Sequence, residues 1–128
     1  MSAPADDDAI ALAHRMFDLA RTGDQQLLAY LDSGVPAGLT DATGNSLLML
    51  AAYHGHAGLV TGLAARGAEV DAINDRGQTP LAGAVFKASP DVVRALLAAG
   101  ADPDLGSPSA RESAVFFEQS ELAALWEG

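Results

Sequence analysis

The sequence predicts an all-α protein, a solenoid built from stacked helical repeats. The first observation is a spacing: Gly34, Gly67 and Gly100 recur with a constant 33-residue period, and a fixed period of this length is typical of a repeat array. The second is that many other positions recur at the same spacing: Gly44 with Gly77, Ser46 with Thr79, Leu48 with Leu81, Ala51 with Ala84, Val60 with Val93, Leu63 with Leu96, Ala68 with Ala101 and Asp71 with Asp104. A repeat array presents a long concave face and no built-in pocket for chemistry, so the spacing indicates a binding function.

Composition narrows the class of protein further. The 128 residues form one domain, over residues 8–126, that can bury a continuous core if successive units stack. The formal net charge of −10 repels phosphate backbones and anionic lipid, which argues against nucleic-acid and membrane partners, and it attracts a basic partner. Cysteine is absent, which excludes disulfides, thiolate catalysis and cysteine-based zinc sites. The sequence lacks a secretory signal and any run of about 18 apolar residues, so we expect a cytoplasmic protein.

The first unit, about residues 8–38, is predicted to hold two helices behind a disordered tail over residues 1–7. Carboxylates at Asp6–Asp8 favour a helix start there, because they accept hydrogen bonds from free N–H groups and complement the helix dipole. An apolar stripe at helical spacing follows: Ile10, Ala13, Phe17 and Ala20. A second helix begins at the capping residue Asp24 and ends at Gly34. Its inward face is predicted to consist of Leu27, Leu28 and Leu31.

The second and third units, about residues 39–72 and 73–105, share one plan of turn, helix, break and helix. Gly44 and Gly77 suit the positive φ of the turns, and Pro80 and Pro90 suit the first turn of a helix, where a missing N–H is tolerated. The helices are predicted over residues 46–53, 57–65, 79–86 and 90–98.

The fourth unit, about residues 106–126, is predicted to be a truncated cap. Ala110 replaces the turn glycine, and two short helices over residues 114–117 and 121–126 close the stack. Terminal repeats are atypical because one of their faces meets water. Trp126 either packs as a lid on the last layer or forms an edge for dimerisation.

The repeated motifs identify a family resemblance. They read Gly44-Asn45-Ser46-Leu47-Leu48, Leu50-Ala51-Ala52, Gly55-His56, Leu59-Val60 and Gly67-Ala68 in one unit, and Gly77-Gln78-Thr79-Pro80-Leu81, Ala84, Val92-Val93-Arg94-Ala95-Leu96-Leu97 and Gly100-Ala101-Asp102 in the next. With two full units in one register, the chain resembles the ankyrin repeat family over roughly residues 9–126. The resemblance implies helix–turn–helix units joined by projecting β-turn loops, and protein binding through loop tips and the concave inner-helix face. Gly62 and Gly83 depart from the expected helix formers, either at a cost of up to ~1 kcal/mol each relative to alanine or to permit close helix approach.

By position, the resemblance implies a set of partner-binding residues. They are Thr43, Asn45, Asp75, Arg76 and Gln78 at the loop tips, and Tyr53, His54, Phe86 and Lys87 on the inner helices. Tyr53 and Phe86 are separated by one full period, so they occupy equivalent places in neighbouring layers. An exposed aromatic pair of this kind is typical of a binding hot spot. The alternative is that the two rings pack between layers and bind no partner.

Metal sites and cofactors are not predicted. His54 and His56 are two residues apart at a helix boundary, where their side chains diverge, and His56 matches the family's structural histidine. The loop acids lack the dense ligand pattern of a calcium loop, so we interpret them as polar loop residues or as an acidic docking ridge. These acids are Glu69, Asp71, Asp102 and Asp104.

The predicted function is a monomeric, non-enzymatic module that binds another protein, with Tyr53 and Phe86 as apolar anchors. Phosphate-binding glycine loops, G-x-S-x-G and H-E-x-x-H motifs are absent from the sequence. One alternative is a small regulatory or immunity-type subunit that inhibits a basic enzyme or toxin through its acidic surface. Strong salt sensitivity of binding would favour that alternative. Another alternative is a structural role through self-association at the Trp126 end.

Overall fold

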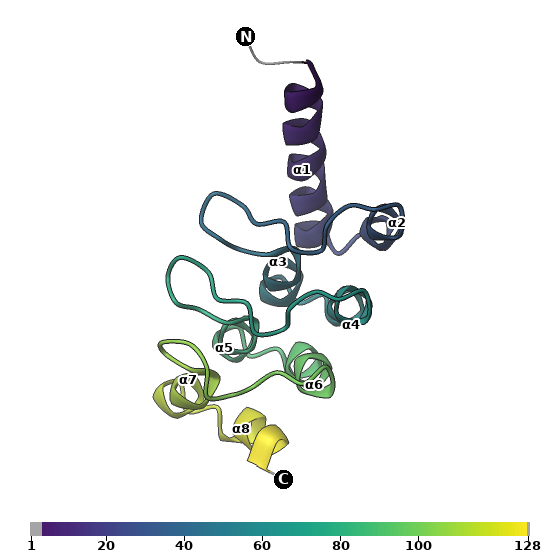
Figure 1. Ribbon diagram of the computed structural model, residues 1–128. Coiled ribbons are helices and arrows are strands. Elements are labelled where there is room, and N and C mark those ends of the chain that lie inside the picture. The colour runs from purple at the N-terminus through teal and green to yellow at the C-terminus, as the bar shows by residue number, and fades with distance from the viewer. Residues whose placement is uncertain (1–3, 128) are drawn as a thin grey trace.

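The computed structural model describes residues 4–127, and eight α-helices account for most of them (Figure 1). The helices are α1 (Pro4–Thr22), α2 (Gln26–Asp32), α3 (Leu47–Tyr53), α4 (Ala57–Ala65), α5 (Pro80–Phe86), α6 (Pro90–Ala98), α7 (Ala110–Phe116) and α8 (Ser120–Glu127).

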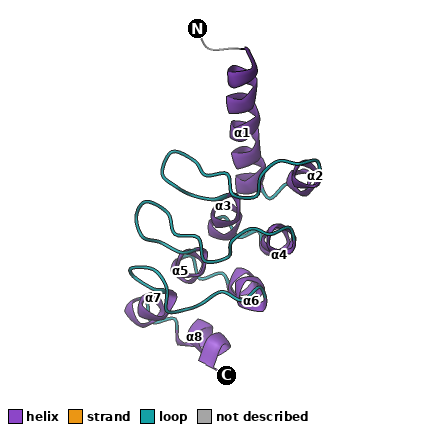
Figure 2. Ribbon diagram, viewed as in Figure 1, coloured by secondary structure: helices purple, strands orange, loops and turns teal. Residues whose placement is uncertain are grey.

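The helices form two columns, with α1, α3, α5 and α7 in one and α2, α4, α6 and α8 in the other (Figure 1). Each helix packs against the next in its own column and against its partner in the same layer. The loops before α3, α5 and α7 project to one side of the stack, and residues 4–127 contain isolated β-bridges but no strand (Figure 2). The prediction of an all-α helical repeat fold is therefore confirmed.

One apolar core runs through all four layers, from Met16 in α1 to Leu122 in α8. Equivalent positions of the repeat are buried alike, since Leu63 and Leu96 are both fully buried. Because every layer contributes to the same cluster, no layer has a separate core of its own.

Side-chain caps explain where the inner helices begin. Ser46 Oγ accepts a hydrogen bond from Met49 N (3.1 Å), and Thr79 Oγ1 accepts one from Ala82 N (3.2 Å), so α3 and α5 start directly after these residues. Ser109 repeats this role, but it follows Thr79 three positions sooner than a full period would place it. The shortening expected in the fourth unit therefore lies in its loop.

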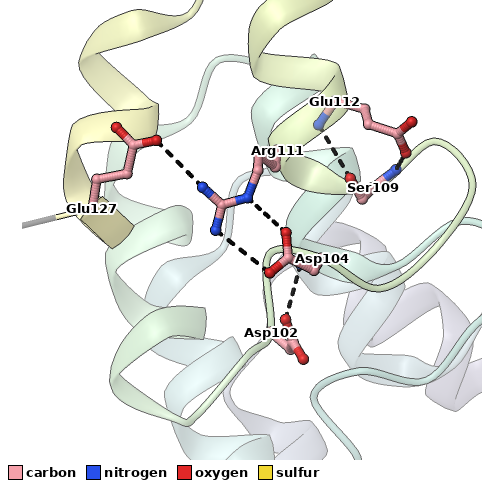
Figure 3. A network of polar contacts seen from close by, with 6 residues as sticks. All are labelled: Asp102, Asp104, Ser109, Arg111, Glu112 and Glu127. Atoms are coloured by element: carbon pink, nitrogen blue, oxygen red, sulfur yellow. Dashed lines mark hydrogen bonds and ion pairs between the residues drawn. The ribbon is translucent and has the colours of Figure 1, made fainter.

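The predicted start of the last inner helix at residue 114 is wrong, because α7 begins at Ala110. Ser109 and Glu112 form a reciprocal capping box: Glu112 N donates to Ser109 Oγ (3.1 Å), and Ser109 N donates to Glu112 Oε1 (2.9 Å). Arg111 then ties α7 to the loop through Asp104 (2.6 Å) and to α8 through Glu127 (3.3 Å) (Figure 3).

Two expectations for the N-terminal region are also wrong. The tail expected over residues 1–7 is helical from Pro4 onward, since proline fits the first helical turn without losing a hydrogen bond; residues 1–3 lie outside the described part of the chain. Ile10, expected in the buried stripe, is 57% exposed. The N-terminal half of α1 extends past the rest of the stack (Figure 1), whereas Phe17, further along the same helix, is buried in the core.

Candidate functional site

The projecting loops and the inner helices enclose a groove of about 590 Å³. Its lining includes seven of the nine residues predicted to contact a partner: Thr43, Asn45, Tyr53, His54, Arg76, Gln78 and Phe86. Lys87 does not line it but lies over the Tyr53 ring, with Nζ 4.9 Å from the ring centroid. Asp75 also lies outside the groove, on the loop tip, where its side chain is next to Gly44. Eight of the nine residues are exposed, and Asn45 is half-buried.

Hydrogen bonds within and between the loops build one wall of the groove. Asp41 Oδ1 accepts from the backbone N–H groups of Thr43 (3.0 Å) and Asn45 (2.9 Å), which closes the first turn. Asn74, one period after Asp41, closes the second turn in the same way and also donates from Nδ2 to Asn45 Oδ1 (2.8 Å). The side-chain amide of Asn74 thus joins two neighbouring loops.

Backbone hydrogen bonds continue this connection along the array. Asp75 N donates to the carbonyl oxygen of Thr43 (3.1 Å), and Ser107 N donates to that of Gly77 (2.9 Å). All three loops are therefore held together before any ligand arrives.

The hydrogen bonds of this wall lower the pKa of the Asp41 carboxyl. Partial burial raises its pKa, but the hydrogen bonds donated by Asn45 and Thr43 together outweigh that effect. The pKa of Asp41 therefore lies below its ordinary value of 3.8. A charged acceptor makes these loop hydrogen bonds stronger than neutral ones.

Aromatic rings occupy the end of the groove opposite the loops. Tyr53 is 39% exposed, Phe86 is 53% exposed and Phe117 is 39% exposed. Phe86 and Phe117 meet edge to face with ring centroids 5.3 Å apart, and Phe116 packs on Phe117 in the same manner at 4.9 Å.

Sequence reasoning missed Phe117 and the apolar floor of the groove, which includes Met49 and Ala82. The regular period does not lead to Phe117, because the fourth unit is offset by three residues. The signal that could have found it is the Ser109–Glu112 capping box, which aligns Phe116 with Phe86 and Phe117 with Lys87.

The charge of the groove lining differs from that of the whole chain, which is strongly acidic. Among the described residues that line it there is no aspartate or glutamate, whereas Arg76 and His54 are present. Burial of the His54 imidazole lowers its pKa below 6.5, and repulsion from His56, Lys87 and Arg21 lowers it further. The protonated form of His54 is therefore disfavoured, and the permanent positive charge of the described lining is that of Arg76.

The other candidate residues have structural partners. His56 donates from Nε2 to the carbonyl oxygen of Arg21 (2.7 Å), which links the first two layers as the family resemblance implies. Asp71 accepts from Asp102 N (3.0 Å), Asp102 accepts from Asp104 N (2.9 Å), and Asp104 pairs with Arg111 (Figure 3). Over residues 4–127 no three potential metal-binding side chains cluster together.

Trp126 packs against the core cluster from α8, as expected of a lid, and its Nε1 is buried without a hydrogen-bond partner in the described residues. The exposed apolar side chains at this end of the stack are instead Val115 and Phe116, at 76% and 79%. Within the part of the chain that the structure describes, no helix is both long and apolar enough to cross a membrane.

Comparisons with known proteins agree with this architecture. A family model for three ankyrin repeats matches residues 16–107. An ankyrin repeat protein of Pseudomonas aeruginosa is 54% identical over 48 residues, which are 37% of this chain and 28% of that protein. An ankyrin repeat-containing protein of Treponema pallidum is 42% identical over 77 residues, 59% of this chain and 26% of that protein.

A third relative is the nuclear factor NF-kappa-B p105 subunit of Rattus norvegicus, 41% identical over 99 residues, 73% of this chain and 10% of that protein. The chain thus spans less than a third of the length of each of these relatives. Ankyrin repeats are in general modules for protein–protein interaction. Because the family model for three ankyrin repeats matches residues 16–107, which are more than half of the chain, the chain belongs to the ankyrin repeat family.

Proposed function

We propose that this chain is a non-catalytic module that binds a partner protein in the groove between its loop tips and inner helices. The observation that carries the proposal is the set of three exposed rings, Tyr53, Phe86 and Phe117, at the end of a groove whose loops are already joined by hydrogen bonds. Aromatic side chains in a preformed pocket are typical of binding hot spots. The chain acts as a monomer in this proposal, without nucleic acid or membrane.

The proposed mechanism is rigid presentation. Tyr53 and Phe86 supply apolar contact area, while the loop tips and helix ends supply polar contacts and set the register of the partner. The polar set is Thr43, Asn45, His54, Asp75, Arg76, Gln78 and Lys87. Asn74 holds Asn45 and Gln78 in place through its Nδ2 hydrogen bonds, so these side chains lose little conformational freedom when a partner binds.

The test is affinity capture from a lysate of the source organism, with bound proteins identified by mass spectrometry. The wild-type chain is compared with the double variant Tyr53→Ser/Phe86→Ser. A matched control, Ile73→Ser/Leu105→Ser, removes two exposed apolar side chains that lie outside the groove. A protein retained by wild type and control but lost from the groove variant supports the proposal. If the groove variant retains the same proteins as wild type, the groove is not the binding site.

The second candidate is a regulatory or immunity-type subunit that inhibits a basic enzyme or toxin. The net charge of −10 favours it, because acidic surface attracts a basic protein at long range. The carboxylates that would act lie outside the groove, so this function would use another surface. A complex that dissociates with salt but is unaffected by Tyr53→Ser/Phe86→Ser would support this second function over the first.

A further inference from the structure

The groove differs in charge from the rest of the molecule. The chain contains 17 acidic and 7 basic residues, yet none of the described residues lining the groove is acidic. Two carboxylates of the loops lie outside the lining: Asp41 is held by hydrogen bonds from Thr43 and Asn45, and Asp75 lies next to Gly44. The described lining of the groove therefore carries no acid, although the protein as a whole is strongly acidic.

The two cations at the groove, Arg76 and Lys87, have no ionic partner among the described side chains. Four arginines elsewhere each lie within 3.2 Å of a carboxylate oxygen: Arg21, Arg66, Arg94 and Arg111. Arg15 is bonded to the Tyr30 hydroxyl (3.1 Å) and to Gln26 (3.2 Å). Among the described side chains, those of residues 7–127, no carboxylate lies within 4.0 Å of the charged nitrogens of Arg76 or Lys87. These two side chains retain their capacity to pair with an incoming acid.

Arg76 and Lys87 lie on either side of the apolar floor. Arg76 belongs to the loop before α5, and Lys87 directly follows the last residue of α5, a helix of seven residues. At ~1.5 Å per residue, the helix alone separates the two by about 10 Å. The groove lining includes Met49 and Ala82, and also Phe86, which directly precedes Lys87 in the chain.

We propose that the groove binds an acidic, apolar segment of its partner, in which a large apolar side chain is flanked by carboxylates that pair with Arg76 and Lys87. The inference rests on the proposed function, since it assumes that the groove is the binding site. The guanidinium of Arg76 takes a carboxylate in a two-pronged hydrogen-bonded pair, and the Lys87 ammonium attracts a second one while it stays over the Tyr53 ring. A basic segment is repelled by both cations, although the protein as a whole attracts it.

The surroundings of His54 also favour a negatively charged ligand. Burial lowers the pKa of its imidazole most, and the charged groups that act on it, His56, Lys87 and Arg21, all disfavour its protonated form as well. A carboxylate placed beside Lys87 would offset that repulsion and make protonation of His54 easier. Affinity for an acidic segment should therefore rise as the pH falls through the lowered pKa of His54.

The probe is a displayed library of random peptides of about twelve residues, long enough at ~3.3 Å per residue to cross the groove. Selection uses the full chain as bait, and the dissociation constants of selected peptides are then measured by fluorescence anisotropy. Three variants are compared with wild type: the charge reversal Arg76→Glu/Lys87→Glu, the groove variant Tyr53→Ser/Phe86→Ser, and Arg15→Glu/Arg94→Glu. The last is a control with the same net charge as the reversal and with its changes on α1 and α6, outside the groove.

The expected peptides carry aspartate or glutamate on both sides of an aromatic or large aliphatic residue. Charge reversal should weaken them by about tenfold or more, whereas the control should change their affinity by less than about twofold. Peptides with lysine in place of the acids should bind the charge-reversed variant better than wild type. Thermal unfolding of each variant tests whether the fold is retained, which we expect because all the altered side chains are exposed.

Two results would overturn the inference. One of them leaves the proposed function intact, and the other contradicts it as well. Basic or uncharged peptides that bind wild type, lose affinity in Tyr53→Ser/Phe86→Ser and tolerate charge reversal would refute the acidic segment but keep the groove as the site. Peptides that bind all four proteins alike, or a selection that enriches none, would count against both the inference and the proposed function.

Discussion

Phe86 and Phe117 meet edge to face across two layers of the stack, with ring centroids 5.3 Å apart, although the helix register aligns Phe86 with Phe116. The pair joins the third layer to the fourth at the aromatic end of the groove. Because Phe86 remains 53% exposed in this arrangement, one ring face is still available to a ligand. The contact between layers and the binding surface are thus made by the same side chains.

Tyr53→Ser and Phe86→Ser should each lower the free energy of unfolding by only about 1 kcal/mol or less, because both rings are exposed and an aromatic pair contributes about that much. Urea denaturation of the two single variants measures this. A loss of several kcal/mol would place these rings in the core and remove them from the candidate site.

Leu63→Ala and Leu96→Ala should each destabilise the protein by about 2–5 kcal/mol. Both side chains are fully buried at equivalent places in α4 and α6, so truncation leaves a cavity between layers. Urea denaturation of the two variants measures this loss. A loss below about 1 kcal/mol in both variants would contradict the packing described above.

Ala88→Gly and Glu118→Gly should each stabilise the protein by about 1 kcal/mol. Ala88 (φ 53°) and Glu118 (φ 54°) stand in the left-handed conformation that Gly55 (φ 84°) adopts between the two helices of the second layer. Side chains other than glycine are strained there. Thermal unfolding tests this, with Gly55→Ala as the converse change, which should destabilise; unchanged or lowered melting temperatures in both glycine variants would contradict it.

Gly62 and Gly83 should respond differently to alanine. A Cβ on Gly62 would lie 2.5 Å from Leu28 Cδ1, so Gly62→Ala must displace that side chain and is expected to destabilise. A Cβ on Gly83 would lie 3.6 Å from Tyr53 Cδ1, an ordinary contact, so Gly83→Ala should gain up to ~1 kcal/mol from helix propensity. Equal shifts in the denaturation midpoints of the two variants would contradict the distinction.

Acid should weaken the loop wall through Asp41. Its pKa is lowered in the folded state, so the stability it contributes is present above its ordinary value of 3.8 and is lost as the pH falls through the folded value. Wild type should therefore lose more free energy of unfolding between about pH 5 and about pH 3 than Asp41→Asn. Asn74 shows that an amide accepts the same turn hydrogen bonds, which makes the variant a suitable comparison. Parallel pH profiles of the two proteins would contradict this role of Asp41.

Local signals allowed the middle of the fold to be predicted from the sequence. The second helices of the middle units were predicted over residues 57–65 and 90–98, and α4 and α6 have those bounds. Ser46 and Thr79, predicted as the first residues of their helices, are instead the caps that precede them. Each of these boundaries depends on a proline, glycine or hydroxyl residue whose effect is confined to a few neighbours.

The fourth layer could not be predicted by extending the period. Removal of three residues from one loop changes which residues face the groove, and only the Ser109–Glu112 pair in the sequence indicates the new register. The charge of the groove could not be predicted from the sequence either. A net charge of −10 is a sum over the chain, whereas the positive character of the groove depends on which arginines find carboxylates in the folded protein.

The groove is built by three consecutive layers, since Thr43 and Tyr53 come from the second, Arg76 and Phe86 from the third, and Pro108 and Phe117 from the fourth. In an array where each layer touches only its neighbours, local opening between layers limits cooperativity. A partner segment bound along the groove would contact all three layers and so bridge the two interfaces between them. Its binding free energy would then suppress opening between layers, so the layers would unfold more cooperatively when the partner is bound.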